Sequence, residues 1–145
     1  MSVYDLEEKR EIPIKFPDTI GQRFYIGYVN DNLYFRQGAE DDELCVARIN
    51  FSELLQNNNL QATIVIGPED VGYTNITQIS PNGRYFATCG NDEDFILIYD
   101  FEQNKWIVRM AQPDGHDFWI LRFMDNHTLY IYNEHSTLAL EITLP

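Results

Sequence analysis

The feature that most constrains the fold of this chain is a series of short apolar segments, each followed by turn-forming residues. Residues 76 to 111 read ITQISPNGRYFATCGNDEDFILIYDFEQNKWIVRMA. Runs rich in Ile, Val, Tyr, Phe and Thr, bounded by Pro-Asn-Gly and by acidic or amide clusters, are typical of β-strands. Four such runs occupy this region, at 74–80, 84–89, 95–99 and 105–110. The sequence therefore predicts four antiparallel strands in a meander.

The rest of the chain also consists of short apolar segments, and helical spacing of apolar residues is nearly absent. Further strands are expected at 2–6, 12–16, 23–29, 33–37, 44–50, 61–66, 118–123, 128–132 and 138–144. A turn is expected at Asp31-Asn32, and Gly67-Pro68 is expected to end a strand. One helical turn is expected within 51–59, capped by the hydroxyl of Ser52. The predicted fold class is all-β.

The strands repeat. First strands of successive units begin near Arg23, Thr74 and Phe118. A period of roughly 40–45 residues with four strands in each repeat is typical of β-propeller blades. We therefore predict an incomplete propeller of about three blades in a single domain. Its expected divisions are two strands in 1–16, a full blade in 17–70, a full blade in 71–112, and three strands in 113–145.

Several short stretches resemble the WD40-repeat family. ISPNGRYFAT (79–88) resembles the turn after the first strand of a blade and the strand that follows it. LIYDFEQNKWI (97–107) and SVYDLEEKREI (2–12) resemble the passage from the third strand into the fourth. Gly115-His116-Asp117 resembles the Gly-His pair that opens a blade. The resemblance implies four-stranded blades that present a binding surface to proteins or peptides.

The same resemblance implies a structural set of polar residues in each blade. In the middle blade Thr88, either Asp92 or Asp94, and Tyr99 match three of the family's four hydrogen-bonding places, and Tyr73 stands where the family has His. The third strand of that blade ends in Asp100. In the last blade the His place is filled by His116, and Leu140 or a neighbour stands where the family has Trp.

The negative net charge of the chain limits the kinds of molecule that it is expected to bind. The chain has 10 Lys and Arg against 23 Asp and Glu, a formal charge of −13. Nucleic acids and anionic membranes are bound through Lys and Arg, so neither is expected as a partner. Basic peptides or basic protein surfaces fit this charge. The two cysteines, Cys45 and Cys89, lie in separate apolar runs and are expected to be reduced. With no signal-peptide pattern at the start, we expect a cytoplasmic or nuclear protein.

The sequence contains no convincing catalytic or metal-binding pattern. His116 has no second ligand at zinc spacing, and the acidic runs 41–43 and 92–94 lack the form of a calcium loop. We therefore predict no cofactor, no metal ion and no enzymatic activity, but a scaffold for protein interactions. One alternative is a propeller hydrolase or lactonase that uses a metal. Another is a fragment whose role is to complete a larger propeller.

Two sets of residues are predicted to contact a partner. Trp106 and Arg109 lie on the outer, fourth strand of the middle blade, and both residue types are common interface anchors. In the predicted blades, the strand at 12–16 and the last strand each lack a neighbour. A second copy of the chain, or a separate chain, is expected to complete them through Ile12, Ile14, Leu138 and Leu140.

Overall fold

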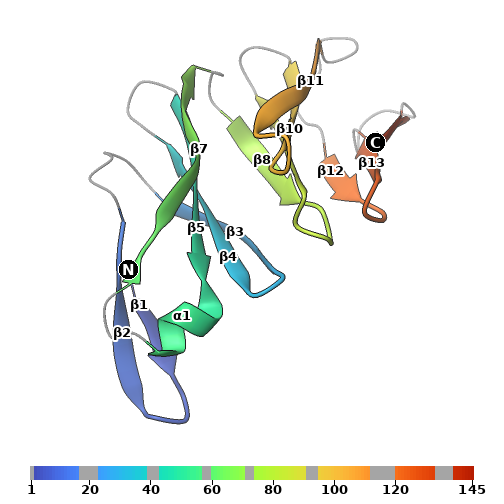
Figure 1. The fold of residues 1–145 in the computed structure, drawn as a ribbon. Coiled ribbons are helices and arrows are strands. Elements are labelled where there is room, and N and C mark those ends of the chain that lie inside the picture. The colour runs from blue at the N-terminus through green and yellow to red at the C-terminus, as the bar shows by residue number, and fades with distance from the viewer. Residues whose placement is uncertain are drawn as a thin grey trace. The chain divides into compact units, whose positions relative to one another are not determined.

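The computed structural model confirms the all-β prediction (Figure 1). It describes residues 2–16, 23–38, 43–56, 60–70, 74–90, 95–111, 120–132 and 139–145. The chain divides into two compact units, Met1–Glu69 and Asp70–Pro145. We take each unit by itself.

The first unit contains two sheets and one short helix. The three-stranded sheet has the order β1-β2-β6, with bounds β1 Ser2–Asp5, β2 Arg10–Lys15 and β6 Leu60–Gln61. The four-stranded sheet has the order β3-β4-β5-β7, with bounds β3 Arg23–Val29, β4 Asn32–Gly38, β5 Glu43–Asn50 and β7 Thr63–Asp70. Helix α1, Phe51–Gln56, follows β5. The buried side chains Ile12, Ile14, Phe35, Ala47, Ile49 and Ala62 form one core, to which both sheets contribute.

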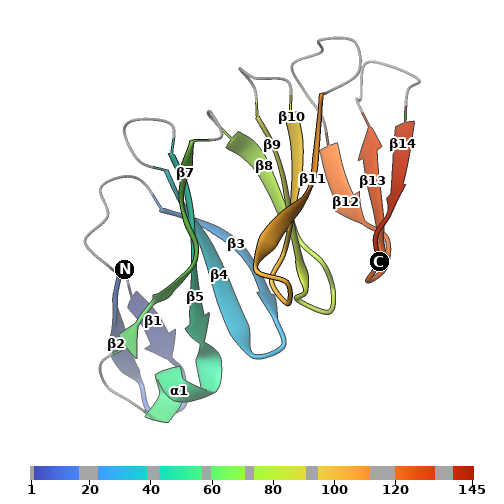
Figure 2. The same ribbon diagram turned by 45° about the horizontal axis from the view of Figure 1, so that its top comes forward.

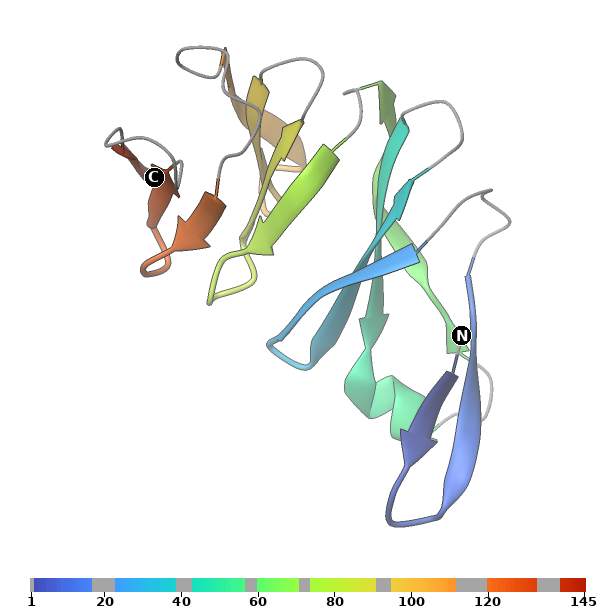
Figure 3. The ribbon, with the colours of Figure 1, turned by 180° about the vertical axis from the view of Figure 1, so that it is seen from behind.

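The second unit contains the predicted meander and the three strands that follow it (Figure 2). The four-stranded sheet has the order β11-β10-β9-β8, with bounds β8 Thr74–Ile79, β9 Tyr85–Gly90, β10 Phe95–Asp100 and β11 Lys105–Ala111. The other has the order β12-β13-β14, with bounds β12 Ile120–Phe123, β13 Thr128–Tyr132 and β14 Ala139–Thr143. All neighbours in both sheets are antiparallel. Strand β12 lies alongside β8 (Figure 3).

These two sheets of the second unit share a core. It joins side chains from β9 and β10 to side chains from β12, β13 and the residue after β14. Its buried members are Tyr85, Ala87, Cys89, Ile96, Ile98, Leu121, Leu129, Ile131 and Leu144. The alternation of the strands selects them, because residues two apart point to the same face of a sheet.

The tight turns follow from their residues. The two central residues of the β3–β4 hairpin are Asn30 and Asp31, with φ of 47° and 63°. Asn and Asp tolerate this left-handed region better than most side chains, and two such residues match the twist of a two-residue hairpin. The turn predicted at Asp31-Asn32 therefore lies one residue earlier. In the β8–β9 turn, Gly83 supplies the left-handed residue, with φ of 72°.

Two predictions about residues 51–70 were wrong. The side chain that caps α1 is Asn50, whose Oδ1 accepts the N–H of Glu53 at 3.0 Å, whereas the hydroxyl of Ser52 donates to the carboxylate of Asp31. Gly67-Pro68 does not end a strand, because β7 continues to Asp70. Pro68 is tolerated because β7 is the edge strand of its sheet, where one side of the backbone needs no ladder hydrogen bond.

Strand β2 has a neighbour that the sequence did not predict. The short strand β6 pairs with it in parallel, with Ile14 opposite Leu60 and Lys15 opposite Gln61. The N–H of Ala62 then donates to the carbonyl of Lys15 at 2.8 Å. The prediction that β2 lacks a further neighbour was therefore wrong, since a segment after α1 in the same chain pairs with its last two residues.

Candidate functional site

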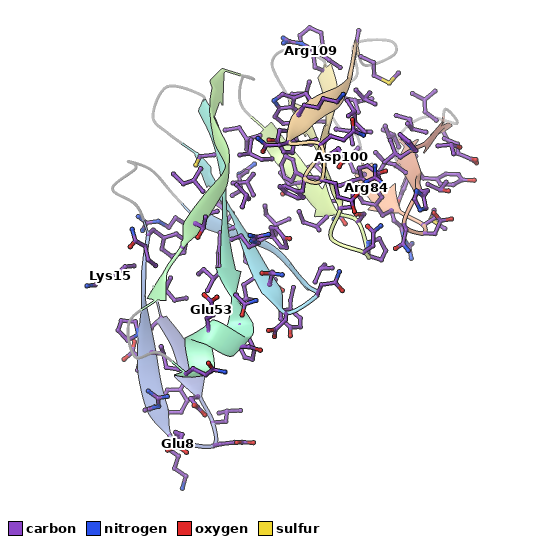
Figure 4. The ribbon with its side chains drawn as sticks, viewed as in Figure 1. Glu8, Lys15, Glu53, Arg84, Asp100 and Arg109 are labelled. Atoms are coloured by element: carbon purple, nitrogen blue, oxygen red, sulfur yellow. The ribbon has the colours of Figure 1, made fainter. Side chains whose placement is uncertain are left out.

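Among the described residues, a dense set of polar contacts lies where the β8–β9 turn meets the β10–β11 turn. Asp100 ends β10 and is completely buried, and Arg84 stands just before β9. Their side chains point toward each other (Figure 4). Arg84 Nη2 lies 2.8 Å from Asp100 Oδ2, and Arg84 Nε lies 3.2 Å from the same oxygen. The hairpin register explains the meeting, because Asp100 is paired with Tyr85, the next residue.

The turn that follows β10 completes the coordination of this carboxylate. Asp100 accepts the backbone N–H groups of Glu102 at 2.8 Å and Gln103 at 3.2 Å, and the amide of the Gln103 side chain at 2.9 Å. Burial acts to raise the pKa of Asp100, but the hydrogen bonds from Arg84, Gln103 and Glu102 outweigh it and hold that pKa below its ordinary value. The carboxylate is thus ionised and fully engaged by its own chain.

The β8–β9 turn is held in a similar way. Ser80 is buried, and its Oγ accepts the N–H of Tyr85 at 2.8 Å while donating to Asn82 Oδ1 at 2.7 Å. The N–H of Gly83 donates to the Ser80 carbonyl at 2.8 Å. These contacts fix the turn, and they engage the Ser80 hydroxyl both as a donor and as an acceptor. The cluster of Ser80, Arg84 and Asp100 is therefore a structural one.

Trp106 and Arg109, predicted as partner anchors, have different surroundings. The ring of Trp106 packs at 5.1 Å from that of Tyr99 and at 6.3 Å from that of Phe86, so much of it is covered by its own sheet. Its Nε1 is buried and has no hydrogen-bond partner among the described residues. Arg109 is exposed, and its guanidinium carbon lies 4.8 Å from the ring centre of Phe95. Arg109, labelled in Figure 4, is therefore the more exposed of the two.

The structure brings together only part of the predicted blade set. Thr88 is completely buried, and its hydroxyl donates to the carbonyl of Ile76 on β8 at 3.1 Å. Tyr99 is buried, and its hydroxyl donates to Asn104 Oδ1 at 2.7 Å. The other predicted members lie outside the described residues: Asp92, Asp94 and His116.

Four residues were predicted to contact a second chain, and the structure describes three of them. Ile12 and Ile14 are buried in the core of the first unit. In the folded chain their side chains are covered by its own residues and cannot contact a partner. Leu140 is half-buried against the core of the second unit. Leu138 lies outside the described residues.

The exposed aromatic residues of β3 were not predicted from the sequence. Phe24, Tyr25 and Tyr28 are 43%, 59% and 51% exposed. The pairing of β3 with β4 shifts register between Tyr25 and Gly27, which marks a bulge. The extra residue puts Tyr25 and Tyr28 on one face, opposite Phe35 and Leu33. The signal for it was Gly27, since a glycine inside a strand often marks a bulge.

No group of three or more His, Cys, Asp or Glu within the described ranges is arranged to hold a metal ion. No helix in that part of the chain is long and apolar enough to cross a membrane. A comparison with models of known protein families found no match. A comparison with curated proteins found none either.

Proposed function

We propose that this chain is a non-enzymatic module for protein interactions, built from WD40-like blades. The observation that carries the proposal is the burial of β9 and β10, the inner strands of the β8–β11 sheet, on both faces. Tyr85 and Ala87 point into the shared core, and Phe86 and Thr88, on the opposite face, are also completely buried. A sheet that stands between two neighbours, as a propeller blade does, needs this pattern.

Three further features support the blade interpretation. The β8–β11 and β3–β7 sheets are four-stranded, and each has its earliest strand at one edge and its latest strand at the other. In the second unit the first strands of consecutive sheets, β8 and β12, lie side by side (Figure 3). The Asp at the end of the third strand is Asp100, in the position that the family resemblance implies.

The partner proposed is a basic peptide or protein surface. In the second unit the chain passes between strands at 91–94, 112–119 and 133–138, and these segments carry Asp or Glu but no Lys or Arg. Phe95 pairs with Ala111, and Tyr132 pairs with both Ile120 and Ala139, so the strand ends that flank these segments lie at the same end of each sheet. The excess of acidic over basic residues in these three segments favours a cationic partner.

A binding assay with matched variants tests this. The probe is a fluorescent peptide rich in Lys and Arg, compared with an acidic peptide of equal length, by anisotropy at 0.15 M salt. Replacing Asp92, Glu93 and Asp94 with Asn, Gln and Asn should weaken binding of the basic peptide by about tenfold. The matched control replaces Glu7, Glu8 and Glu11 with Gln, which removes the same charge from the first unit.

Equal losses in the two triple variants would mean that only net charge matters, and the proposal would fail. A rise in melting temperature on addition of Ca²⁺ or Zn²⁺ would also count against it, because ligand binding to the native state stabilises it. That result would instead favour a metal-dependent hydrolase.

A further inference from the structure

The sheet β12-β13-β14 has one open face. Its buried face carries Leu121, Leu129 and Ile131, which belong to the core of the second unit. On the opposite face no described side chain is fully buried: Arg122, Ala139, Glu141 and Thr143 are exposed, and the others are partly exposed. That face consists of Ile120, Arg122, Thr128, Tyr130, Tyr132, Ala139, Glu141 and Thr143.

The open face has a defined order. Arg122 on β12 is opposite Tyr130 on β13, and Tyr130 is opposite Glu141 on β14. The three form a row across the sheet, with a positive charge at one end and a negative charge at the other. The hydroxyl of Tyr130 donates to Glu141 Oε2 at 2.5 Å, which holds the acidic end in place. A neighbouring row consists of Ile120, Tyr132 and Ala139.

This order makes the face complementary to itself. A two-fold axis lying over β13 and parallel to it would turn the row end for end. Arg122 of one copy would then lie over Glu141 of the second copy, and the same pair would form again on the other side of the axis. Isologous contacts of this kind are the commonest in homo-oligomers, because each side supplies what the other lacks.

The residue types fit an interface. Tyr and Arg are enriched in protein interfaces, and Tyr130 and Tyr132 would lie at the centre with Ile120 beside them. Two stacked sheets lie about 10 Å apart, a distance that tyrosine and arginine side chains can fill from both sides. Lys does not occur on the face, which agrees with the depletion of Lys in interface cores.

We propose that two copies of this chain associate through the open face of the β12-β13-β14 sheet, with Arg122 of each copy paired to Glu141 of the other. The face has only three short strands, so the contact belongs to the small, weak class of interfaces. Repulsion between two chains of charge −13 weakens it further at low salt and is screened at physiological salt. Monomer and dimer therefore exchange with protein concentration.

Sedimentation equilibrium of the whole chain at 0.15 M salt, from about 5 to 500 μM, tests the proposal. The expected result is a monomer–dimer equilibrium within this range. Arg122→Glu and Glu141→Arg, made singly, place like charges together twice in each dimer. Each single variant should raise the dissociation constant at least about tenfold. The double variant, with the charges exchanged, should recover most of the association.

A matched control variant separates the effect of direct pairing from the effect of net charge, and spectroscopy checks that each variant is folded. Arg48→Glu makes the same change of charge as Arg122→Glu, but at an exposed site in the first unit. It should leave the dissociation constant within about twofold of the wild type, since surface charges away from a contact act weakly. Circular dichroism and melting temperature show whether each variant is folded.

Two results would overturn the proposal. One is a wild-type chain that stays monomeric up to 500 μM, or that associates without limit. The other is a folded double variant that associates no better than the two single variants, because the recovery depends on direct pairing of Arg122 with Glu141.

Discussion

The two sheets of the second unit are joined through one core yet differ in how they use their second face. In the β8–β11 sheet the inner strands β9 and β10 are buried on both faces, and β10 reads FILIYD, with burial from Ile96 to Asp100. In the β12–β14 sheet one face is buried, and β13 reads TLYIY, with burial only at Leu129 and Ile131. Continuous apolar strands therefore mark a sheet that is covered on both faces, and alternating strands mark a sheet that is covered on one face.

The difference extends to polar residues. In the doubly buried sheet Thr88 and Asp100 are completely buried, and each finds its partners within the chain. On the open face Arg122 and Glu141 are exposed to water. A charge on the doubly buried sheet must be matched inside the fold, whereas charges on the open face are available to another molecule.

The largest expected effect comes from the two faces of a single strand. Ile131 points into the core and is completely buried, while the adjacent Tyr132 points to the open face. Ile131→Ala should lower the free energy of unfolding of the second unit by about 3–4 kcal/mol, through lost burial and a cavity. Tyr132→Ala should change it by less than about 1 kcal/mol. Urea unfolding followed by circular dichroism measures both, and similar losses would contradict the assignment of the faces.

The second effect tests the charge buried in the doubly covered sheet. Asp100→Ala should cost about 2–3 kcal/mol, because it leaves Arg84 and two turn N–H groups without their acceptor. The control is Glu102→Ala. Glu102 also contacts Arg84, at 3.2 Å, but its side chain is 69% exposed, so its removal should barely alter stability. Equal effects of the two variants would show that the burial of Asp100 does not matter.

Much of this fold could be predicted because hydrophobic alternation and turn residues are local signals. The meander from β8 to β11 and the strands of the last sheet were predicted within one or two residues of most of their bounds. The parallel pairing of β6 with β2 could not be predicted, because it depends on where the chain returns after α1. The cap of α1 was also missed because of a contact between residues distant in sequence. The hydroxyl of Ser52 donates a hydrogen bond to Asp31 and so does not cap the helix.

The polar site shows the same limit. Asp100 was singled out by its place at the end of a strand, but its pairing with Arg84 was not predicted. A hairpin register would have revealed it, because Arg84 comes directly before the partner of Asp100. The packing of Trp106 against Tyr99 and Phe86 was missed too, since three different strands must be in place before those rings meet.

The third prediction concerns a neutral hydrogen bond in the doubly buried sheet. Thr88→Val keeps the shape of the side chain but removes the donor to the Ile76 carbonyl. An acceptor left without its partner in a buried site costs about 1–2 kcal/mol. Thr143→Val, on the exposed strand β14, is the control and should have almost no effect on the melting temperature. If both variants melt like the wild type, the Thr88 hydroxyl contributes nothing to this sheet.

The smallest effect reports on the core that joins the two sheets. Cys89 lies in that core on β9, and burial raises the pKa of its thiol from about 9 to about 12. Because the folded-state pKa is the higher one, this contribution to stability is complete below about pH 9 and is lost as the pH rises toward 12. At pH 10 the loss amounts to about 1 kcal/mol.

Urea unfolding of the wild type and of Cys89→Ala at pH 7 and pH 10, under reducing conditions, isolates the contribution of this thiol. Alanine cannot ionise, and every other titratable group is the same in the two proteins. The wild type should lose about 1 kcal/mol more than the variant between these pH values. Equal losses would mean that water reaches the thiol, and that the two sheets do not exclude it from their shared core.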